Sequence, residues 1–94
     1  MDIRDAQKWV VDAWSKSEKK MNKVSELASF LEESGEMAEA IRKIEHGKNC
    51  VVDLEKEMGD ILLTLLTLAI RYKVDLQKAF DKTMDDVKKK YIIK

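Results

Sequence analysis

The chain has 94 residues, of which 45% are apolar and 38% charged, with three glycines and no proline. Because glycine and proline punctuate strands and turns, this composition favours an all-α fold, and the length fits a single domain over residues 1–94. Eighteen basic and eighteen acidic residues cancel, which argues against nucleic acid or an anionic membrane as a partner. A single cysteine excludes an internal disulfide and no signal peptide is recognisable, so we expect a cytoplasmic protein.

The first predicted helix covers residues 3–19. Apolar side chains recur at steps of three and four from Ile3 to Trp14, which is the period of an amphipathic helix, and Asp2 is a suitable N-cap. Trp9 lies off this stripe, so we expect it at a second interface rather than in the first core.

The second predicted helix begins at residues 23–25 and ends at His46 and Gly47. A glycine just after a helix can adopt the left-handed conformation, and a histidine in the last turn suits the negative end of the helix dipole. We therefore interpret His46 as a cap-region residue rather than a metal ligand or a base. A short link follows, so this helix and the next should form an antiparallel hairpin. The side expected to be buried carries Leu27, Phe30, Leu31, Met37, Ala38, Ile41 and Ile44.

The third predicted helix spans residues 53–72, and a break at Val74 and Asp75 precedes a fourth helix for which Asp75 is a suitable N-cap. After Ile61 the third helix is apolar on nearly every side, which predicts a central position and a homo-oligomer. Its longest apolar run, residues 61–70, is about half of the roughly 20 residues that a membrane span needs. The inner side of the fourth helix carries Leu76, Ala79, Phe80, Thr83, Val87 and Tyr91.

Two pairs of carboxylates have the same spacing on neighbouring helices. Glu33 and Glu36 are three residues apart, and so are Glu57 and Asp60. Residues three apart on a helix point in similar directions, so each pair can bind one ion from one side. In an antiparallel hairpin the two pairs can meet at one level.

A solvated charged face is the ordinary interpretation of such a pattern, and it stays open beside a cation site. Like charges four residues apart destabilise a helix, however, and Glu32 with Glu36 is one such pair, as is Asp53 with Glu57. Nearby, only Glu39 and Lys43 offer a favourable pair. Oxygen ligands without clustered Cys or His favour Mg²⁺ or Mn²⁺ over zinc.

The segment LEESGEMAEAI (residues 31–41), followed by EMGDIL (residues 57–62), resembles the EExxE and ExxD signature of the MazG-like nucleotide pyrophosphohydrolases, in the all-α NTP pyrophosphatase superfamily. The resemblance extends from about Leu27 to Tyr91. It implies homodimers or homotetramers that complete a four-helix bundle across the subunit interface. It also implies Mg²⁺-dependent hydrolysis of nucleoside triphosphates to monophosphate and diphosphate. By position, the metal ligands are Glu33, Glu36, Glu57 and Asp60, and the catalytic carboxylates are Glu32, which orients water, and Glu33.

Basic side chains are needed to bind the triphosphate, and an aromatic side chain can stack on the base. The candidates for the triphosphate are Lys20, Lys23, Lys82, Lys88 and Lys89, each of which can instead be a solvated surface lysine, and Trp14 is the candidate for stacking on the base.

The chain also departs from the family pattern. Lys56 stands where many relatives have a glutamate, and Met84 and Asp86 stand where relatives often have asparagine or a basic residue. These departures leave open a helical metal-binding interaction module without turnover. A second alternative is a phosphoribosyl-ATP pyrophosphohydrolase-like enzyme, because that relative has similar motifs. The preferred base and sugar, the number of metals and the choice between dimer and tetramer stay open as well.

Overall fold

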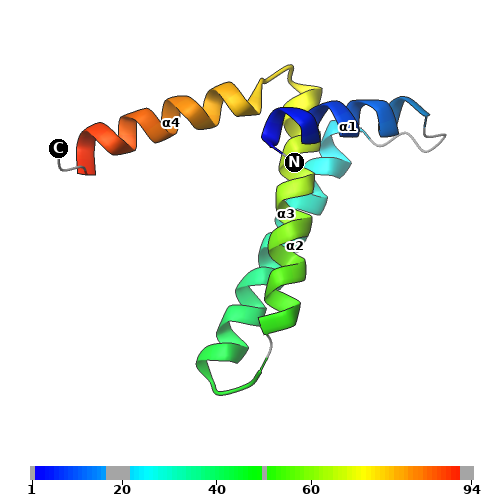
Figure 1. The fold of residues 1–94 in the computed structure, drawn as a ribbon. Helices are drawn as coiled ribbons and strands as arrows, with labels where there is room; N and C mark the ends of the chain where they lie inside the picture. The colour runs from blue at the N-terminus through cyan, green and yellow to red at the C-terminus, as the bar shows by residue number, and fades with distance from the viewer. Residues whose placement is uncertain (1, 17–21, 50, 92–94) are drawn as a thin grey trace.

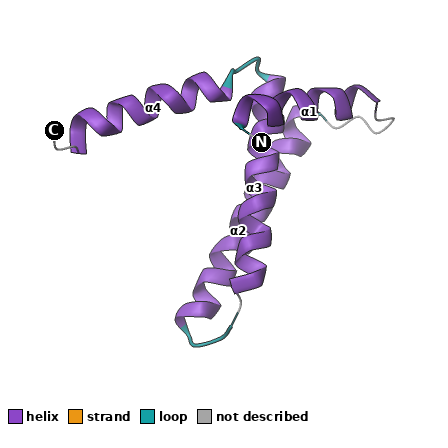
Figure 2. Ribbon diagram, in the orientation of Figure 1, coloured by secondary structure: helices purple, strands orange, loops and turns teal. Residues whose placement is uncertain are grey.

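The computed structural model describes residues 2–16, 22–49 and 51–91, and these ranges consist of helices and short connections (Figure 2). The four helices of this part of the chain are α1 (Ile3–Lys16), α2 (Lys23–Glu45), α3 (Val51–Arg71) and α4 (Leu76–Tyr91). The predicted all-α architecture is therefore confirmed. The third helix begins two residues before its predicted start, and the predicted end of the first helix falls at residues 17–21, outside the described ranges. None of the described helices combines the length and hydropathy of a membrane span.

The helix ends follow from short polar residues beside the first turns. Asp2 and Asp75 act as the predicted N-caps, because their Oδ1 atoms accept from the backbone N–H of Asp5 at 2.8 Å and of Lys78 at 3.1 Å. Asn22 caps α2 by accepting from the Ser25 N–H at 2.7 Å. At the other end of α2, His46 Nδ1 donates to the Arg42 carbonyl at 2.7 Å, which confirms its assignment to the cap region. Gly47 then takes the left-handed conformation, with φ of 85°.

Helices α2 and α3 lie side by side and antiparallel, and they form the long hairpin of Figure 1. This confirms the predicted hairpin. Helix α1 packs across α3 near the end of the hairpin that lies away from the α2–α3 link, where Val10 and Leu66 are buried. Helix α3 is therefore the central helix, as predicted.

The seam between α2 and α3 contains a ladder of facing residues, most of them polar. Glu26 pairs with Arg71 at 2.8 Å, and Glu33 accepts from Thr64 at 2.8 Å. Both pairs step by seven residues along each helix, and the same step leads to Ala40 and Glu57, which line a common cavity. A seven-residue step keeps residues on the same side of a helix. The three rungs of the ladder are therefore Glu26–Arg71, Glu33–Thr64 and Ala40–Glu57.

The ladder corrects the predicted buried side of α2. Of the seven apolar residues expected there, Leu27 and Leu31 are 49% and 62% exposed, and Ala38 and Ile41 are also exposed. The buried residues of α2 are Glu26 and Ala40. Arg71 and Thr64 on α3 bind the carboxylates of Glu26 and Glu33 on α2. The side of α2 that carries these glutamates therefore faces α3, and part of its apolar side faces outward.

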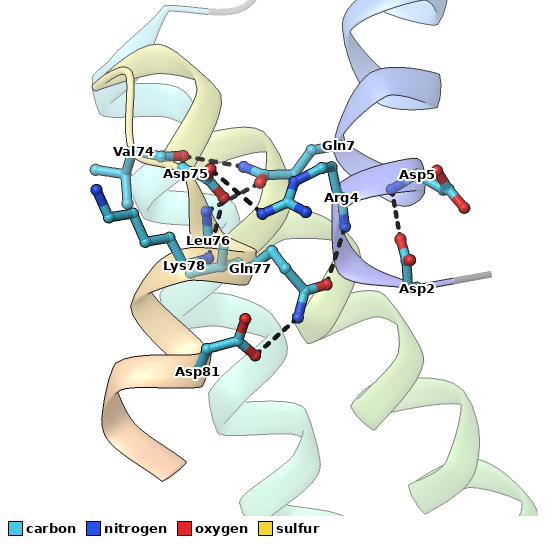
Figure 3. A network of polar contacts seen from close by, with 10 residues as sticks. All are labelled: Asp2, Arg4, Asp5, Gln7, Val74, Asp75, Leu76, Gln77, Lys78 and Asp81. Atoms are coloured by element: carbon cyan, nitrogen blue, oxygen red, sulfur yellow. Dashed lines mark hydrogen bonds and ion pairs between the residues drawn. The ribbon is translucent and has the colours of Figure 1, made fainter. Parts of the chain in front are cut away.

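Helix α4 projects away from the hairpin, and its first turn is fixed against α1 (Figure 3). The Gln7 side chain both donates to the Val74 carbonyl at 3.1 Å and accepts from the Leu76 N–H at 2.9 Å. Arg4 lies 3.7 Å from Asp75. These contacts fix the direction in which α4 leaves, while its predicted inner side, Phe80, Val87 and Tyr91 included, stays exposed.

This arrangement gives the molecule a large surface. Its accessible area is 7544 Å², whereas a compact monomer of 94 residues exposes roughly 5,600 Å². The radius of gyration is 16.0 Å, against about 12 Å for a compact chain of this length. A single copy thus leaves apolar surface uncovered on more than one helix.

Candidate functional site

The four carboxylates predicted as metal ligands lie along the middle of the α2–α3 seam. Glu33 is half-buried and accepts from the Thr64 hydroxyl, whose oxygen is also 2.9 Å from the Asp60 carbonyl oxygen. Thr64 therefore ties the position of Glu33 on α2 to the turn of α3 that carries Asp60. These contacts link the two motif helices at this level of the hairpin, whereas the meeting of all four carboxylates at one ion stays a prediction.

Glu57 has the least favourable environment of the four carboxylates. Its Oε2 is buried without a hydrogen-bond partner. Burial raises the pKa of Glu57 above its ordinary value of 4.5, and the proximity of the Glu36 carboxylate raises it further. Ala40, the residue opposite on the ladder, has no polar side chain to offer. The Glu57–Glu36 pair thus favours a shared proton or a bound cation.

Asp60 has a partner that the sequence analysis did not assign. The Lys56 Nζ lies 2.9 Å from Asp60 Oδ2, one helical turn away on α3. The hydrogen bond to Asp60 and its charge raise the pKa of Lys56, and the charges of Glu57 and Glu36 add to this effect. Lys56 is therefore a cation within the field of three carboxylates, and it relieves part of the repulsion that the spacing predicts.

Glu39 also differs from its prediction. It pairs with Arg42, whose Nε donates to Oε2 at 3.0 Å, and not with Lys43. Positions three and four residues ahead are both within reach of a glutamate on a helix, and the guanidinium can bind both carboxylate oxygens. Glu39 is consequently neutralised on the exposed side of α2.

A cavity of about 240 Å³ opens beside the third rung of the ladder. Lining it are Glu36, Glu39, Ala40, Lys43, Asp53 and Glu57. Glu33 and Asp60 lie outside this lining. In the part of the chain that the structure describes, no group of three or more acidic, His or Cys side chains is arranged to hold a metal ion. Thr64 holds Glu33 and Lys56 holds Asp60, so Glu36 and Glu57 are left as the pair that faces the cavity.

The remaining predicted site residues have different surroundings. Glu32 is exposed beside Glu33. The indole of Trp14, 41% exposed, donates to Thr67 Oγ1 at 3.3 Å and thus lies near the seam. Lys23 Nζ lies 4.8 Å from the centre of the Tyr72 ring, near the end of the hairpin. Lys20 is outside the described residues.

The lysines of α4 are not brought to the carboxylates within one chain. Lys82, Lys88 and Lys89 are exposed on α4. This helix leaves the hairpin at the end that lies away from the α2–α3 link (Figure 1). Their predicted role at the triphosphate would therefore require a second copy of the chain.

One comparison with known proteins assigns a family. The model of the MazG nucleotide pyrophosphohydrolase domain matches residues 16–92, a range that includes all four carboxylates and the whole of α2, α3 and α4. No curated protein and no solved structure gives a significant match. The signature motifs, their place on an antiparallel helical hairpin and the extent of the match agree. The chain therefore belongs to the MazG nucleotide pyrophosphohydrolase family.

Proposed function

We propose that the protein is a Mg²⁺-dependent nucleoside triphosphate pyrophosphohydrolase. It converts a ribo- or deoxyribonucleoside triphosphate and water into the monophosphate and diphosphate, and the expected role is to cleanse the nucleotide pool. The observation that carries the proposal is the buried Glu57 Oε2, which has no hydrogen-bond partner and lies beside Glu36. A buried carboxylate oxygen needs a proton, a donor or a cation, and a cation also serves a family that acts on nucleotide phosphates.

The side chains at this site are of the chemical type that binds Mg²⁺, and Mn²⁺ can substitute for it. The proposed ligands are Glu33, Glu36, Glu57 and Asp60, because carboxylate oxygens are the ligands that both ions prefer. When bound, the ion supplies neutralisation of the phosphate charge and acidification of a water. Asp60 becomes available when Lys56 releases it.

Proton transfer is the proposed task of two glutamates on α2. Thr64 holds Oε2 of Glu33, so the other carboxylate oxygen is oriented to accept a proton from the attacking water. Glu32, exposed one position earlier, orients that water. No nucleophilic Ser, Cys or His is required, because water attacks the α-phosphorus directly.

The proposed assembly is a homodimer or homotetramer. The three rungs contain six residues, and each is followed in the sequence by one neighbour. Five of these six neighbours are apolar, and all five are exposed: Leu27, Ile41, Met58, Leu65 and Tyr72. A step of one residue turns each helix by the same angle, and in an antiparallel pair this places the five on one face of the hairpin. We call them the apolar face.

A second copy is the proposed occupant of the apolar face. The surface of one chain exceeds that of a compact monomer by roughly 1,900 Å², which is more than the roughly 800 Å² that each partner buries in a standard protein interface. Packing two hairpins through these faces would complete a four-helix bundle. It would also allow α4 of one copy, with Lys82, Lys88 and Lys89, to approach the carboxylates of the other.

The test is a product analysis with a matched pair of variants. The pure protein is incubated with each NTP and dNTP plus Mg²⁺, and the products are separated by ion-exchange chromatography. We expect monophosphate and diphosphate from at least one nucleotide, a loss of at least about a hundredfold in kcat/KM for Glu36→Gln, and little change for Glu45→Gln, an exposed glutamate near the end of the same helix. Turnover of phosphoribosyl-ATP alone would favour the phosphoribosyl-ATP pyrophosphohydrolase-like enzyme, and no turnover of any nucleotide would favour the interaction module.

A further inference from the structure

Lys56 brings a positive charge into a cluster of carboxylates that the proposed function assigns to a divalent cation. Its ammonium lies 2.9 Å from Asp60 Oδ2, and the side chain is 70% exposed while that of Asp60 is 38% exposed. Glu57 is the next residue along α3, and Glu36 lies opposite on α2. The ammonium thus approaches the carboxylates from the solvent side, at the end of a long flexible side chain.

The ion pair between Lys56 and Asp60 contributes little to the stability of α3 itself. Lys56 precedes Asp60 by four residues, and a base that precedes an acid at this spacing is the less favourable order for a helix. An exposed ion pair also contributes little to stability by itself. The effect of Lys56 is therefore concentrated on the carboxylates, whose mutual repulsion it reduces without occupying the cavity beside Glu57.

We propose that Lys56 is a tethered counter-cation of this site: it stabilises the protein in the absence of metal, and it weakens divalent-cation binding by competing for Asp60. The inference rests on the proposed function, because it concerns the same carboxylates. Lys56 is a positioning residue, since it acts through Asp60. Metal entry requires the ammonium to leave Asp60, and the exposure of its side chain gives it open solvent to move into.

This role predicts two effects of opposite sign for Lys56→Gln. In EDTA the variant should melt about 3 °C below the wild type, because the repulsion among Asp60, Glu57 and Glu36 is no longer reduced. Its affinity for Mn²⁺, measured by isothermal titration calorimetry with the metal alone, should rise about tenfold, because neighbours of metal ligands typically change affinity by this order. A residue that only supports the fold would lower both quantities.

Three further variants complete the test. Lys56→Arg keeps the charge and should retain both wild-type values. Lys78→Gln removes one positive charge from the exposed start of α4 and should also behave as the wild type. Lys56→Met, which keeps an aliphatic stem on the helix, should reproduce Lys56→Gln and replaces it if the glutamine variant does not fold.

The outcomes separate this inference from the proposed function. If the wild type binds Mn²⁺ and Lys56→Gln binds it with equal or lower affinity, the counter-cation role is wrong and the proposed function stands. If neither protein binds Mn²⁺ in the millimolar range, the metal site itself is wrong and both proposals fall. Tighter binding with a lower melting temperature in EDTA supports the role of Lys56.

Discussion

The side chain of Glu57 shows how one buried atom makes stability depend on pH. Because burial and the neighbouring Glu36 raise the pKa of Glu57 above its ordinary value of 4.5, the folded protein holds this proton more tightly than the unfolded chain does. The stability that this proton provides is complete below pH 4.5 and is lost as the pH rises through the folded-state pKa. Ionisation of Glu57 is therefore less favourable in the folded, metal-free protein than in the unfolded chain.

We predict that Glu57→Gln raises the melting temperature of the metal-free protein at pH 7, and that this advantage disappears at pH 4. The glutamine cannot ionise, and so it avoids the repulsion from Glu36. Addition of Mg²⁺ at pH 7 should raise the melting temperature of the wild type more than that of the variant, because a ligand that binds only the folded state stabilises it. Differential scanning calorimetry in EDTA and in Mg²⁺ measures both effects. Glu55→Gln, an exposed neighbour on α3, is the control, and an equal gain in this control would refute the explanation.

At the scale of the elements, the hairpin depends on polar contacts where an apolar seam would be expected. The Glu26 side chain is 4% exposed and the Arg71 side chain 36%, and two guanidinium nitrogens approach the carboxylate at 2.8 and 2.9 Å. Removing one partner of a fully buried pair costs about 3–5 kcal/mol, because the other charge stays buried. The partial exposure of Arg71 reduces this cost.

We expect Arg71→Met to lower the free energy of unfolding by about 2 kcal/mol, measured by urea denaturation. Substituting both partners, Glu26→Leu with Arg71→Met, should recover most of the loss, since no buried charge then lacks a counterion. Arg42→Met breaks the exposed pair with Glu39 and should have a smaller effect. A double variant as unstable as the single one would show that the ion pair is not the cause.

Much of the element scale was predictable, because its signals are local. Capping residues such as Asp75 and the glycine at position 47 marked helix ends. The three-residue spacing of the carboxylates predicted that both pairs lie where α2 meets α3, and Glu36 and Glu57 line one cavity there.

The buried side of α2 was predicted only in part, since Phe30, Met37 and Ile44 are half-buried while the other four apolar residues are exposed. Hydrophobicity shows which side avoids water but not whether a second chain covers it. The partners of Glu39 and Asp60 were missed for a different reason, since several basic residues lie within reach of each and only the fold selects among them.

At the scale of the whole molecule, the uncovered apolar face and the projecting α4 both predict self-association. We expect sedimentation velocity at micromolar concentration to give a dimer or a tetramer for the wild type, and a monomer for Leu27→Lys combined with Leu65→Lys. Two charges placed on one face would have to lose their hydration in the interface, which is costly. Asn49→Lys, in the link between α2 and α3, adds charge away from this face and should not change the oligomer. A wild type that sediments as a monomer would contradict the proposed assembly.

The seven-residue step of the ladder has a consequence for how insertions affect the site. The rungs share one register between α2 and α3. The Glu26–Arg71 ion pair near one end of the hairpin therefore helps to determine which residues face each other several turns away, at Glu36 and Glu57. One residue added between Glu26 and Glu33 would rotate everything beyond it by about 100° and move the acidic side chains out of register. The same residue added to the link after His46 would leave every rung in place. Tolerance to length change should therefore differ sharply between these two neighbouring stretches of one hairpin.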